Sequence, residues 1–216
     1  MTSLTLNLSK PGDTPKKLQL NLKKGESFTV QLGWEGSYDL DLHSMICIND
    51  GSGGKVQAFE DLLSTYNVIR QVKIDGVMQT VGTLPKNPDG TFQIRNGALI
   101  HSPDATDGIK EEIDEFIKVD PTKISVSPGT MVEIPIIAMI HPQSSGKKFA
   151  DVQNANVKIL NADGVSILNA QLSNQFGSFV GVQLGSITIN ESGVSDFVQV
   201  GVGFNGDFND VLGHFS

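Results

Sequence analysis

Apolar residues alternate with polar ones along much of this 216-residue chain, and this period of two constrains its fold most strongly. Side chains of a β-strand point alternately to its two faces, so the period is typical of strands with one face in a core. Turn signals separate such segments at short intervals. The pattern predicts an all-β protein, an antiparallel β-sandwich. The first alternating sets are Leu4, Leu6 and Leu8; Leu18, Leu20 and Leu22; and Phe28, Val30 and Leu32.

Further strands are expected over residues 40–48, 68–74, 77–81, 92–100 (one strand or two), 116–119, 131–140, 157–160, 165–172, 179–189 and 197–204. Asp75-Gly76 predicts a tight hairpin turn. The apolar run 131–140 predicts a strand buried on both faces, and Pro135 within it predicts an edge position or a bulge. One or two short helices are expected, around residues 59–64 and over 207–212.

Composition and charge narrow the class of protein. The length suits one sandwich, and no linker or internal repeat divides the chain, so we expect a single domain over residues 1–216. A formal net charge of -8 argues against a nucleic-acid partner. Cys47, the one cysteine, lies among apolar residues and is expected to be a buried, inert thiol. Neither a signal peptide nor a membrane-spanning run is evident, which favours the cytoplasm.

Two acidic elements carry the chemistry. The first is Asp39-Leu40-Asp41, whose two carboxylates share one face of the expected strand. The second is the run 104–115, with six acids and one base, Lys110. Carboxylates at this density repel one another unless a cation lies among them, and many oxygen ligands favour Ca²⁺. The candidate ligands are Asp39, Asp41, Asp104, Asp107, Glu111, Glu112, Asp114 and Glu115.

Each acidic element also has a simpler interpretation. Asp39 and Asp41 could lie on a solvated strand face. The run 104–115 could form an acidic amphipathic helix, because Ile109, Ile113 and residues 116–117 recur at helical spacing. Pro103 and the segment 106–108 favour a loop instead, so we interpret the run as a metal-binding loop. It is not an EF-hand, because the required ligand spacing is absent.

Several segments together resemble the TerD family of tellurium-resistance and stress proteins. They are Leu22-Lys23-Lys24-Gly25 with Leu32-Gly33-Trp34, Asp39-Leu40-Asp41-Leu42, Tyr66-Asn67, the segment 101–120, Phe149 with Val152, Asn154-Ala155 and Val157, and Val200-Gly201-Val202-Gly203-Phe204. The resemblance implies a β-sandwich that binds Ca²⁺ through the Asp-Leu-Asp strand and the acidic loop. Carried over by position, it implies the ligands Asp39, Asp41, Asp104, Glu111, Asp114 and Glu115.

The chain also departs from this family pattern. Pro103, Ala105, Lys110 and Glu112 replace expected Gly, Asn, Gly and Gly, and Ile113 replaces an expected Asp. Asp107 and Glu112 could supply other oxygen donors, so the usual paired sites could be reduced to one. The stretch of about 68–96 is longer than the family pattern and predicts an inserted hairpin.

Other motifs in the sequence give less information about function. Gly201-x-Gly203-x-x-Gly206 has the letters of a dinucleotide-binding fingerprint, but no crossover helix can follow it. The four histidines lack metal-ligand spacing, and His101 is expected to have a structural or solvent-facing role. Trp34 is expected to anchor the core.

The sequence therefore predicts a cytoplasmic, calcium-binding, non-catalytic stress or tellurium-resistance protein. Its expected partners are calcium ions, and through them other resistance-system proteins or an anionic membrane surface. The alternative is a Ca²⁺-dependent module that docks on lipid headgroups or on a protein. A hydrolase with paired carboxylates is disfavoured, because the acids are too crowded to divide into one acid and one base.

Overall fold

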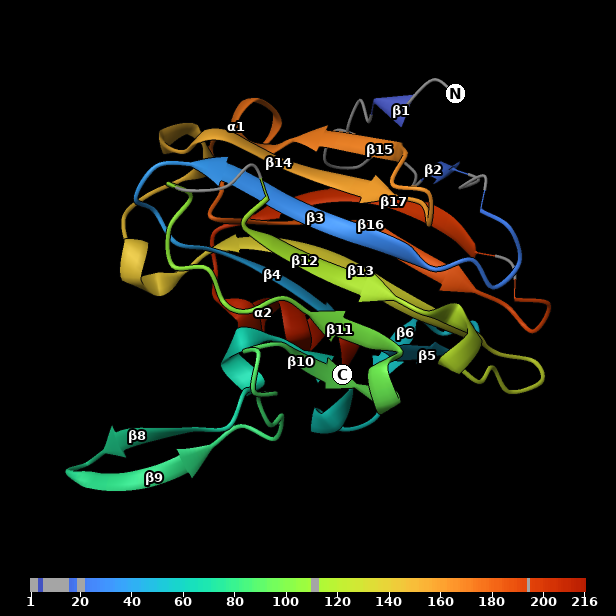
Figure 1. Cartoon of the computed structure of the whole chain (residues 1–216), viewed down its shortest axis with the longest axis horizontal. Coiled ribbons are helices and arrows are strands. Elements are labelled where there is room, and N and C mark those ends of the chain that lie inside the picture. Colours follow the sequence, from blue (N-terminus) through green and yellow to red (C-terminus); the bar gives the residue numbers. More distant parts are fainter. Residues whose placement is uncertain (1–3, 6–15, 19–21, 110–112, 194) are drawn as a thin grey trace.

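Two β-sheets pack face to face in the computed structural model, which describes residues 4–5, 16–18, 22–109, 113–193 and 195–216 (Figure 1). The described residues of the first sheet form seven strands in the order β1-β15-β14-β3-β12-β11-β10. All neighbours pair antiparallel except β1 and β15. The strands are β1 (Leu4–Thr5), β15 (Ser166–Gln171), β14 (Gln153–Leu160), β3 (Phe28–Glu35), β12 (Glu115–Val119), β11 (Leu99–His101) and β10 (Phe92–Ile94).

The second sheet has eight described strands, and its main path runs β2-β17-β16-β13-β4-β7. These are β2 (Lys16–Leu18), β17 (Ser195–Phe204), β16 (Gly181–Ile189), β13 (Met131–Ile140), β4 (Leu40–Met45) and β7 (Leu62–Leu63). Strand β5 (Cys47–Asn49) also pairs with β13, and β6 (Gly54–Val56) pairs with β5. The antiparallel β-sandwich that the alternation predicts is thereby confirmed.

The main core fills the space between the sheets. Leu32 of β3, Leu40 and Leu42 of β4, and Ile134 of β13 all lie in it, each fully buried. A second apolar cluster covers the outer face of the second sheet, where Met139 packs with side chains of the C-terminal segment. Strand β13 is thus buried on both faces, as its continuous apolar sequence predicts. Trp34 and Cys47 are buried as well.

Helical structure is limited to short pieces. The α-helices are α1 (Leu172–Gln175) and α2 (Phe208–Leu212), and α1 was not expected from the sequence. The 3-10 turns are η1 (Phe59–Asp61), η2 (Thr65–Asn67), η3 (Arg95–Gly97), η4 (Pro121–Lys123), η5 (Pro142–Ser144), η6 (Phe149–Asp151) and η7 (Gly213–Phe215). Among the described residues, no helix is long and apolar enough to cross a membrane.

Two details of the strands differ from the sequence prediction. Pro135 lies in a central strand, between β16 on one side and β4 and β5 on the other. Of the two expected alternatives, the edge position is therefore wrong, and the register shift between Ile136 and Ile137 supports the bulge. Pro135 is tolerated because it lies level with the break between β4 and β5, and the β13–β16 register shifts directly after Ile136. The expected single strand over 40–48 is therefore two strands, which separate at Ile46.

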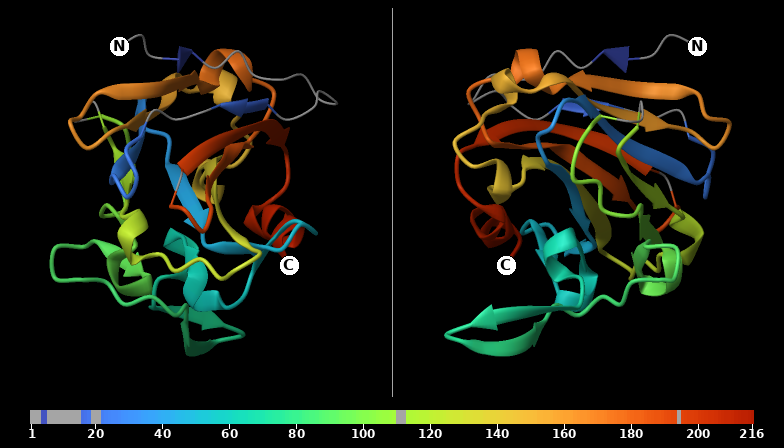
Figure 2. Two further views of the ribbon diagram at one scale, coloured as in Figure 1. Left: turned by 90° about the vertical axis from the view of Figure 1, so that its right-hand side faces the viewer. Right: turned by 60° about the vertical axis from the view of Figure 1, so that its left-hand side comes forward.

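A hairpin projects from the sandwich, as Figures 1 and 2 show. It consists of β8 (Arg70–Ile74) and β9 (Val77–Val81), joined by Asp75 and Gly76. Both turn residues have positive φ, 49° and 83°, which is the backbone that an Asp-Gly hairpin turn requires. The local sequence thus predicts this hairpin correctly.

Candidate metal centre

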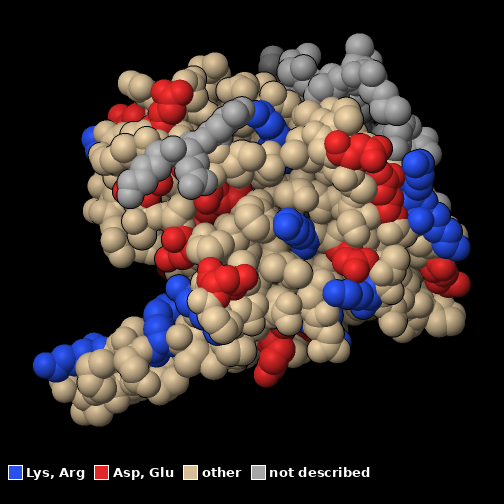
Figure 3. Space-filling model, in the orientation of Figure 1, with Lys and Arg blue, Asp and Glu red and all other residues tan. Residues whose placement is uncertain are grey.

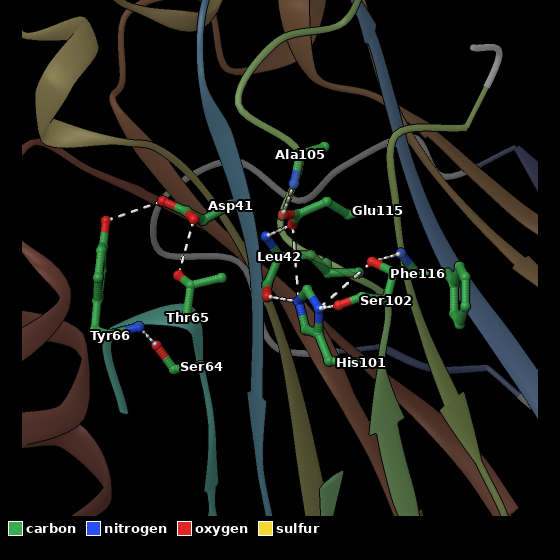
Figure 4. A network of polar contacts seen from close by, with 10 residues as sticks. All are labelled: Asp41, Leu42, Ser64, Thr65, Tyr66, His101, Ser102, Ala105, Glu115 and Phe116. Carbon is green, nitrogen blue, oxygen red and sulfur yellow. Dashed lines mark hydrogen bonds and ion pairs between the residues drawn. The ribbon is translucent and has the colours of Figure 1, made fainter. Parts of the chain in front are cut away.

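The two acidic elements meet at one end of the sandwich, although they belong to opposite sheets. Asp41 lies in β4 of the second sheet, and Glu115 is the first residue of β12 in the first sheet. Strand β3 brings them together, because it pairs with β12 and leads through a turn into β4. Figure 4 shows Asp41 and Glu115 on the two sides of the β4 backbone.

Glu115 completes the unpaired edge of β4. Strand β7 pairs only with Ser44 and Met45, so the backbone of Leu42 lacks a neighbouring strand on that side. The Glu115 carboxylate accepts a hydrogen bond of 2.6 Å from the Leu42 N–H and a longer one, 3.4 Å, from the Ala105 N–H. Glu115 is completely buried, and this burial, with Asp41 and Asp104 nearby, raises its pKa well above the usual range.

His101 contacts the same edge of β4, at the carbonyl oxygen of Leu42. Its Nε2 lies 2.7 Å from the Leu42 carbonyl oxygen, and its Nδ1 lies 2.9 Å from the Ser102 carbonyl oxygen. The ring is fully buried and stacks on Phe92. Burial lowers the pKa of His101, while the two carbonyl oxygens oppose that shift. His101 therefore holds the two sheets together, in keeping with the structural role expected for it.

Asp41 is held by two hydroxyl groups. Its carboxylate oxygens accept hydrogen bonds from Thr65 Oγ1 at 2.9 Å and from Tyr66 Oη at 3.0 Å, as Figure 4 shows. Its exposed fraction is 1%, and burial is the main cause that raises its pKa to about 6. His141 and the two hydroxyl groups oppose this rise, and Asp39 adds to it.

Three carboxylates converge into one group. One oxygen each from Asp41, Asp104 and Glu115 lie within 4.8 Å of one another. Ca²⁺ binds oxygen at 2.3–2.6 Å, so two ligands of one ion are at most about 5 Å apart, and the spacing fits a shared ion. Asp104 comes from the acidic loop and is exposed, whereas the other two are buried.

Asp39 adds a second observation that favours a cation. Its Oδ1 is buried and has no hydrogen-bond partner among the described residues, while its Oδ2 lies 3.2 Å from His141 Nδ1. Burial raises the pKa of Asp39, and the nearby charges of Asp104 and Asp107 raise it further, against the effect of His141. A buried carboxylate oxygen without a donor is costly, and a cation would satisfy it.

The remaining predicted ligands are arranged differently. Asp114 accepts a hydrogen bond of 2.9 Å from the Trp34 N–H, so it ties the loop to β3, and it is not in the group of three. Asp107 accepts from the Ile109 N–H at 3.2 Å in a local turn. Glu111 and Glu112 lie outside the described residues. The described part of the acidic run contains no helical residue, so the alternative of an amphipathic helix finds no support there.

The acidic loop is anchored next to Trp34. Gly108 pairs with Gly36 through backbone hydrogen bonds of 2.9 and 3.3 Å. A Cβ atom at Gly108 would lie 2.5 Å from the Trp34 carbonyl oxygen, so a larger residue would displace the loop. This close approach fixes the position at which Asp104 and Asp107 enter the site.

Four residues of the site were not predicted as contributors. Thr65 and Tyr66 hold Asp41, His141 contacts Asp39, and Ser144 Oγ accepts a hydrogen bond of 3.0 Å from the Asp39 N–H. Tyr66 belongs to a segment that carries the family resemblance. The resemblance indicates that Tyr66 is important, but it does not predict the hydrogen bond from Tyr66 to Asp41. His141 and Ser144 gave no signal, because they lie about a hundred positions from Asp39.

The fold and the site define a β-sandwich with a cluster of carboxylates at one end, and comparison with known proteins supports the fold. Residues 87–215, more than half of the chain, match the family described as the TerD domain. The chain therefore belongs to the TerD domain family.

Individual relatives are more distant. The chain is 26% identical over 184 residues to general stress protein 16U of Bacillus subtilis (strain 168), a match that covers 82% of this chain and 80% of that protein. Among solved structures, a homologue of the telluride resistance protein TerD from Streptomyces coelicolor A3(2) has a TM-score of 0.61 at 17% identity. A protein of unknown function has a TM-score of 0.62 at 13% identity. Each match covers 88% of this chain and 96% of the other, and at this identity each supports the fold alone.

Proposed function

We propose that this protein binds Ca²⁺ and acts as a non-catalytic stress or tellurium-resistance protein of the TerD type. The observation that carries the proposal is the group of Asp41, Asp104 and Glu115, with one oxygen of each within 4.8 Å of the others. Two of these carboxyl groups are buried and have raised pKa values. Such a group is electrostatically unfavourable when ionised unless a cation neutralises it.

The donor set favours Ca²⁺ over other ions. All members of the group are carboxylates, which are hard oxygen ligands, and the group includes neither a thiolate nor an imidazole. One ligand is on an exposed loop and two are on strands, so the group combines a fixed part with an adjustable one. Ca²⁺ accepts such irregular geometry, whereas Mg²⁺ requires a tight octahedron and releases its waters reluctantly.

The residues of the site would have different roles in binding Ca²⁺. Backbone N–H donors position Glu115, and the hydroxyl groups of Thr65 and Tyr66 position Asp41, so both are set before an ion arrives. Asp104 would then be drawn in with its loop, and Asp39 could contribute its unpaired Oδ1. The bound ion would supply positive charge among these groups.

A non-catalytic role agrees with the crowding of the carboxylates. An acid–base pair needs two groups in different environments, on the two sides of a reacting bond. Here Asp41 and Glu115 are both buried, both have raised pKa values, and both belong to one cluster. The one cysteine, Cys47, is buried and burial raises the pKa of its thiol, so it is not an activated thiolate.

Calorimetric titration of the metal-free protein tests the proposal. We expect Ca²⁺ to bind with a dissociation constant roughly between 10⁻⁷ and 10⁻⁴ M and to be preferred over Mg²⁺. Asp104→Asn should weaken binding strongly, because it removes a charge from the group of three. Asp163→Asn is the matched control, since Asp163 is an exposed acid in a distant turn. No heat and no thermal shift at millimolar Ca²⁺ would refute calcium binding.

A second candidate function is docking through the ion. Ca²⁺ takes six to eight oxygen ligands, which is more than the group of three supplies, and Asp104 is exposed on the solvent side. An anionic lipid headgroup or a carboxylate of another protein could occupy the open positions. Co-sedimentation with anionic vesicles in Ca²⁺ and in a chelator separates this function from simple calcium binding.

A further inference from the structure

One face of the β8–β9 hairpin is mainly apolar, and the other is mainly polar. Its register pairs Ile74 with Val77, Val72 with Gln79 and Arg70 with Val81, and paired residues lie on the same face. This places the apolar side chains Val72, Ile74, Val77 and Val81 together, on the same face as Gln79 and, at the base of the hairpin, Arg70. The opposite face carries Gln71, Lys73, Met78 and Thr80, and Gln71 donates a hydrogen bond of 2.7 Å to Thr80 across the strands.

No described element covers the apolar face. Strands β8 and β9 form a two-stranded sheet of their own, and the described residues provide no third strand. Ile74 is 41% exposed and Val77 is 62% exposed. Five of the nine large apolar residues that are exposed in the described structure lie between Phe59 and Met78. An isolated hairpin is marginally stable in water, so an uncovered apolar face on one indicates a contact surface.

The base of the hairpin holds it in a fixed position. The Arg70 guanidinium donates to the carbonyl oxygens of Thr65, Tyr66 and Val68, and the Ile69 N–H donates to the Leu84 carbonyl oxygen at 2.9 Å. Gly82, with φ of 85°, leaves no room for a side chain, because a Cβ atom would lie 2.3 Å from the Val68 carbonyl oxygen. These contacts make the projection a preorganised surface instead of a loose loop.

We propose that the apolar face of the hairpin docks against the same face of a second copy of this chain, which gives a weak twofold-symmetric dimer. The patch of Val72, Ile74, Val77 and Val81 is uncharged and complementary to itself, while Arg70 of the same face is held on backbone carbonyl oxygens at the base of the hairpin. Twofold dimers are the commonest assemblies of identical chains. Projection from the body lets two hairpins meet while the sandwiches stay apart (Figures 1 and 2).

Charge supports this choice of partner. The chain carries a net charge of -8, so two bodies repel when their surfaces approach. Residues 69–82 carry Arg70, Lys73 and Asp75, two cations and one anion, for a net charge of +1. In Figure 3 the projection shows blue and tan atoms, while red atoms gather on the body. The hairpin is thus a place where two copies can touch without the repulsion between their bodies.

A membrane is a poorer partner for the same surface. Asp75 forms the apex of the hairpin, between Ile74 and Val77, and would enter a bilayer first. Placing a carboxylate in the hydrocarbon region costs several kcal/mol by the usual order of magnitude. Docking between two hairpins leaves Asp75 in water at the edge of the contact.

The small size of the face sets the expected affinity. Stable interfaces bury about 800 Å² on each partner, which is more than one face of a hairpin with two five-residue strands can supply. We therefore expect a dissociation constant on the order of 10⁻⁵ to 10⁻³ M. The contact does not use the acidic cluster, so it should form equally in Ca²⁺ and in a chelator.

Sedimentation velocity of the full chain, from about 10 μM to 1 mM at moderate salt, tests the proposal in this affinity range. A reversible monomer–dimer equilibrium is expected. Val77→Asp should raise the dissociation constant of the dimer by about tenfold or more, because each dimer would hold two buried, unpaired carboxylates. Met78→Asp is the matched control: it adds the same charge one residue away, at a similar exposure of 59%, on the opposite face. Met78→Asp should change the dissociation constant of the dimer less than about threefold.

Two further results bear on the proposal. A bismaleimide should link Ile74→Cys chains into dimers, since the native thiol, Cys47, is buried. Monomers throughout the concentration range would overturn the proposal, and so would equal effects of Val77→Asp and Met78→Asp. Binding of the hairpin to vesicles, lost in Val77→Asp without any dimer, would assign the face to a membrane instead. Circular dichroism should show the native fold for every variant, because these side chains lie outside the core.

Discussion

The candidate metal centre and the β8–β9 hairpin are built in opposite ways. The centre joins residues far apart in the chain, such as Leu42 and Glu115, and buries carboxyl groups between two sheets. The hairpin joins neighbours in the sequence and leaves apolar side chains in water. In each region the side chains are in an environment that is unfavourable for their type. Under the two proposals, a cation would offset the unfavourable environment in one region and an apolar surface would do so in the other.

The two regions meet at η2. Thr65 and Tyr66 hold the Asp41 carboxylate with their side chains, and their carbonyl oxygens accept from Arg70 at the base of the hairpin. The same short turn thus touches both surfaces.

The largest effect is expected at Glu115. Glu115→Ala removes the acceptor for the buried Leu42 N–H and leaves a cavity between the sheets. We expect a loss of about 2–3 kcal/mol of unfolding free energy in a chelator, together with loss of calcium binding. Urea denaturation and calorimetry measure the two effects.

Glu115→Gln sharpens the same test. Glutamine keeps an oxygen acceptor for Leu42 but lacks the negative charge, so it should retain more stability than alanine while still losing calcium affinity. Equal losses in both variants would show that the charge of Glu115, rather than its hydrogen bond, stabilises the fold. The hydrogen bond between the Leu42 N–H and Glu115 would then not be what ties the two sheets together.

The second prediction separates binding from stability at Asp41. Asp41→Asn keeps both hydroxyl partners, because an amide can serve as acceptor and donor to Thr65 and Tyr66. We expect calcium affinity to fall by about a hundredfold, or about 2.7 kcal/mol. The metal-free protein should be at least as stable as the parent at neutral pH, because a buried charge is gone. A clear loss of stability in the metal-free variant would contradict this assignment.

The third prediction concerns pH. The folded state raises the pKa of Asp41 from 3.8 to about 6, so the folded protein binds this proton more tightly than the unfolded chain does. The metal-free protein should therefore lose stability as pH rises from about 4 to about 6, by an amount on the order of 1–3 kcal/mol from this group.

Asp39 and His141 lie beside Asp41 and interact with its charge, so the parent must be compared with Asp41→Asn at each pH. The difference between the two unfolding free energies should follow the Asp41 proton alone. Saturating Ca²⁺ should reverse the trend in the parent, because the ion binds the deprotonated site. A flat difference between pH 4 and 7 would show that burial does not perturb Asp41.

The sequence predicted the hairpin better than it predicted the candidate metal centre. The reason is that the hairpin contacts join residues close in the sequence, whereas the contacts of the centre join residues far apart in it. The bounds of β9 follow from a local alternation and from the Asp75-Gly76 turn, so the prediction is correct to the residue. The acidic run has no such local rule. Asp114 and Glu115 are neighbours in the sequence, yet one bonds to β3 and the other to β4.

The partners of the carboxylates could not be predicted for the same reason. Thr65 lies 24 positions from Asp41, and Ser144 lies 105 positions from Asp39. Their contacts depend on how the sheets pack, which alternation alone does not specify. The resemblance named most of the acids, and only the fold shows which of them converge.

The smallest effect is expected at Arg70, and it tests whether the two regions are separate. Arg70→Gln removes a cation that donates to three carbonyl oxygens at the base of the hairpin, two of them on η2. Lys73→Gln is the matched control, because it removes one positive charge from the same strand without a described contact to η2. Both variants change the long-range field at the acidic cluster in the same direction.

If η2 is held mainly by its own backbone and by Asp41, Arg70→Gln should cost about 0.5–1 kcal/mol of stability and weaken calcium binding by no more than about threefold. The Ser64 Oγ cap on the Tyr66 N–H and the Asn67 backbone contacts would remain to keep the turn in place. A tenfold loss of affinity in Arg70→Gln but not in Lys73→Gln would show that the hairpin base positions Asp41. In that case a dimer formed through the hairpin would also alter calcium affinity, and the two regions would have to be treated as one coupled unit.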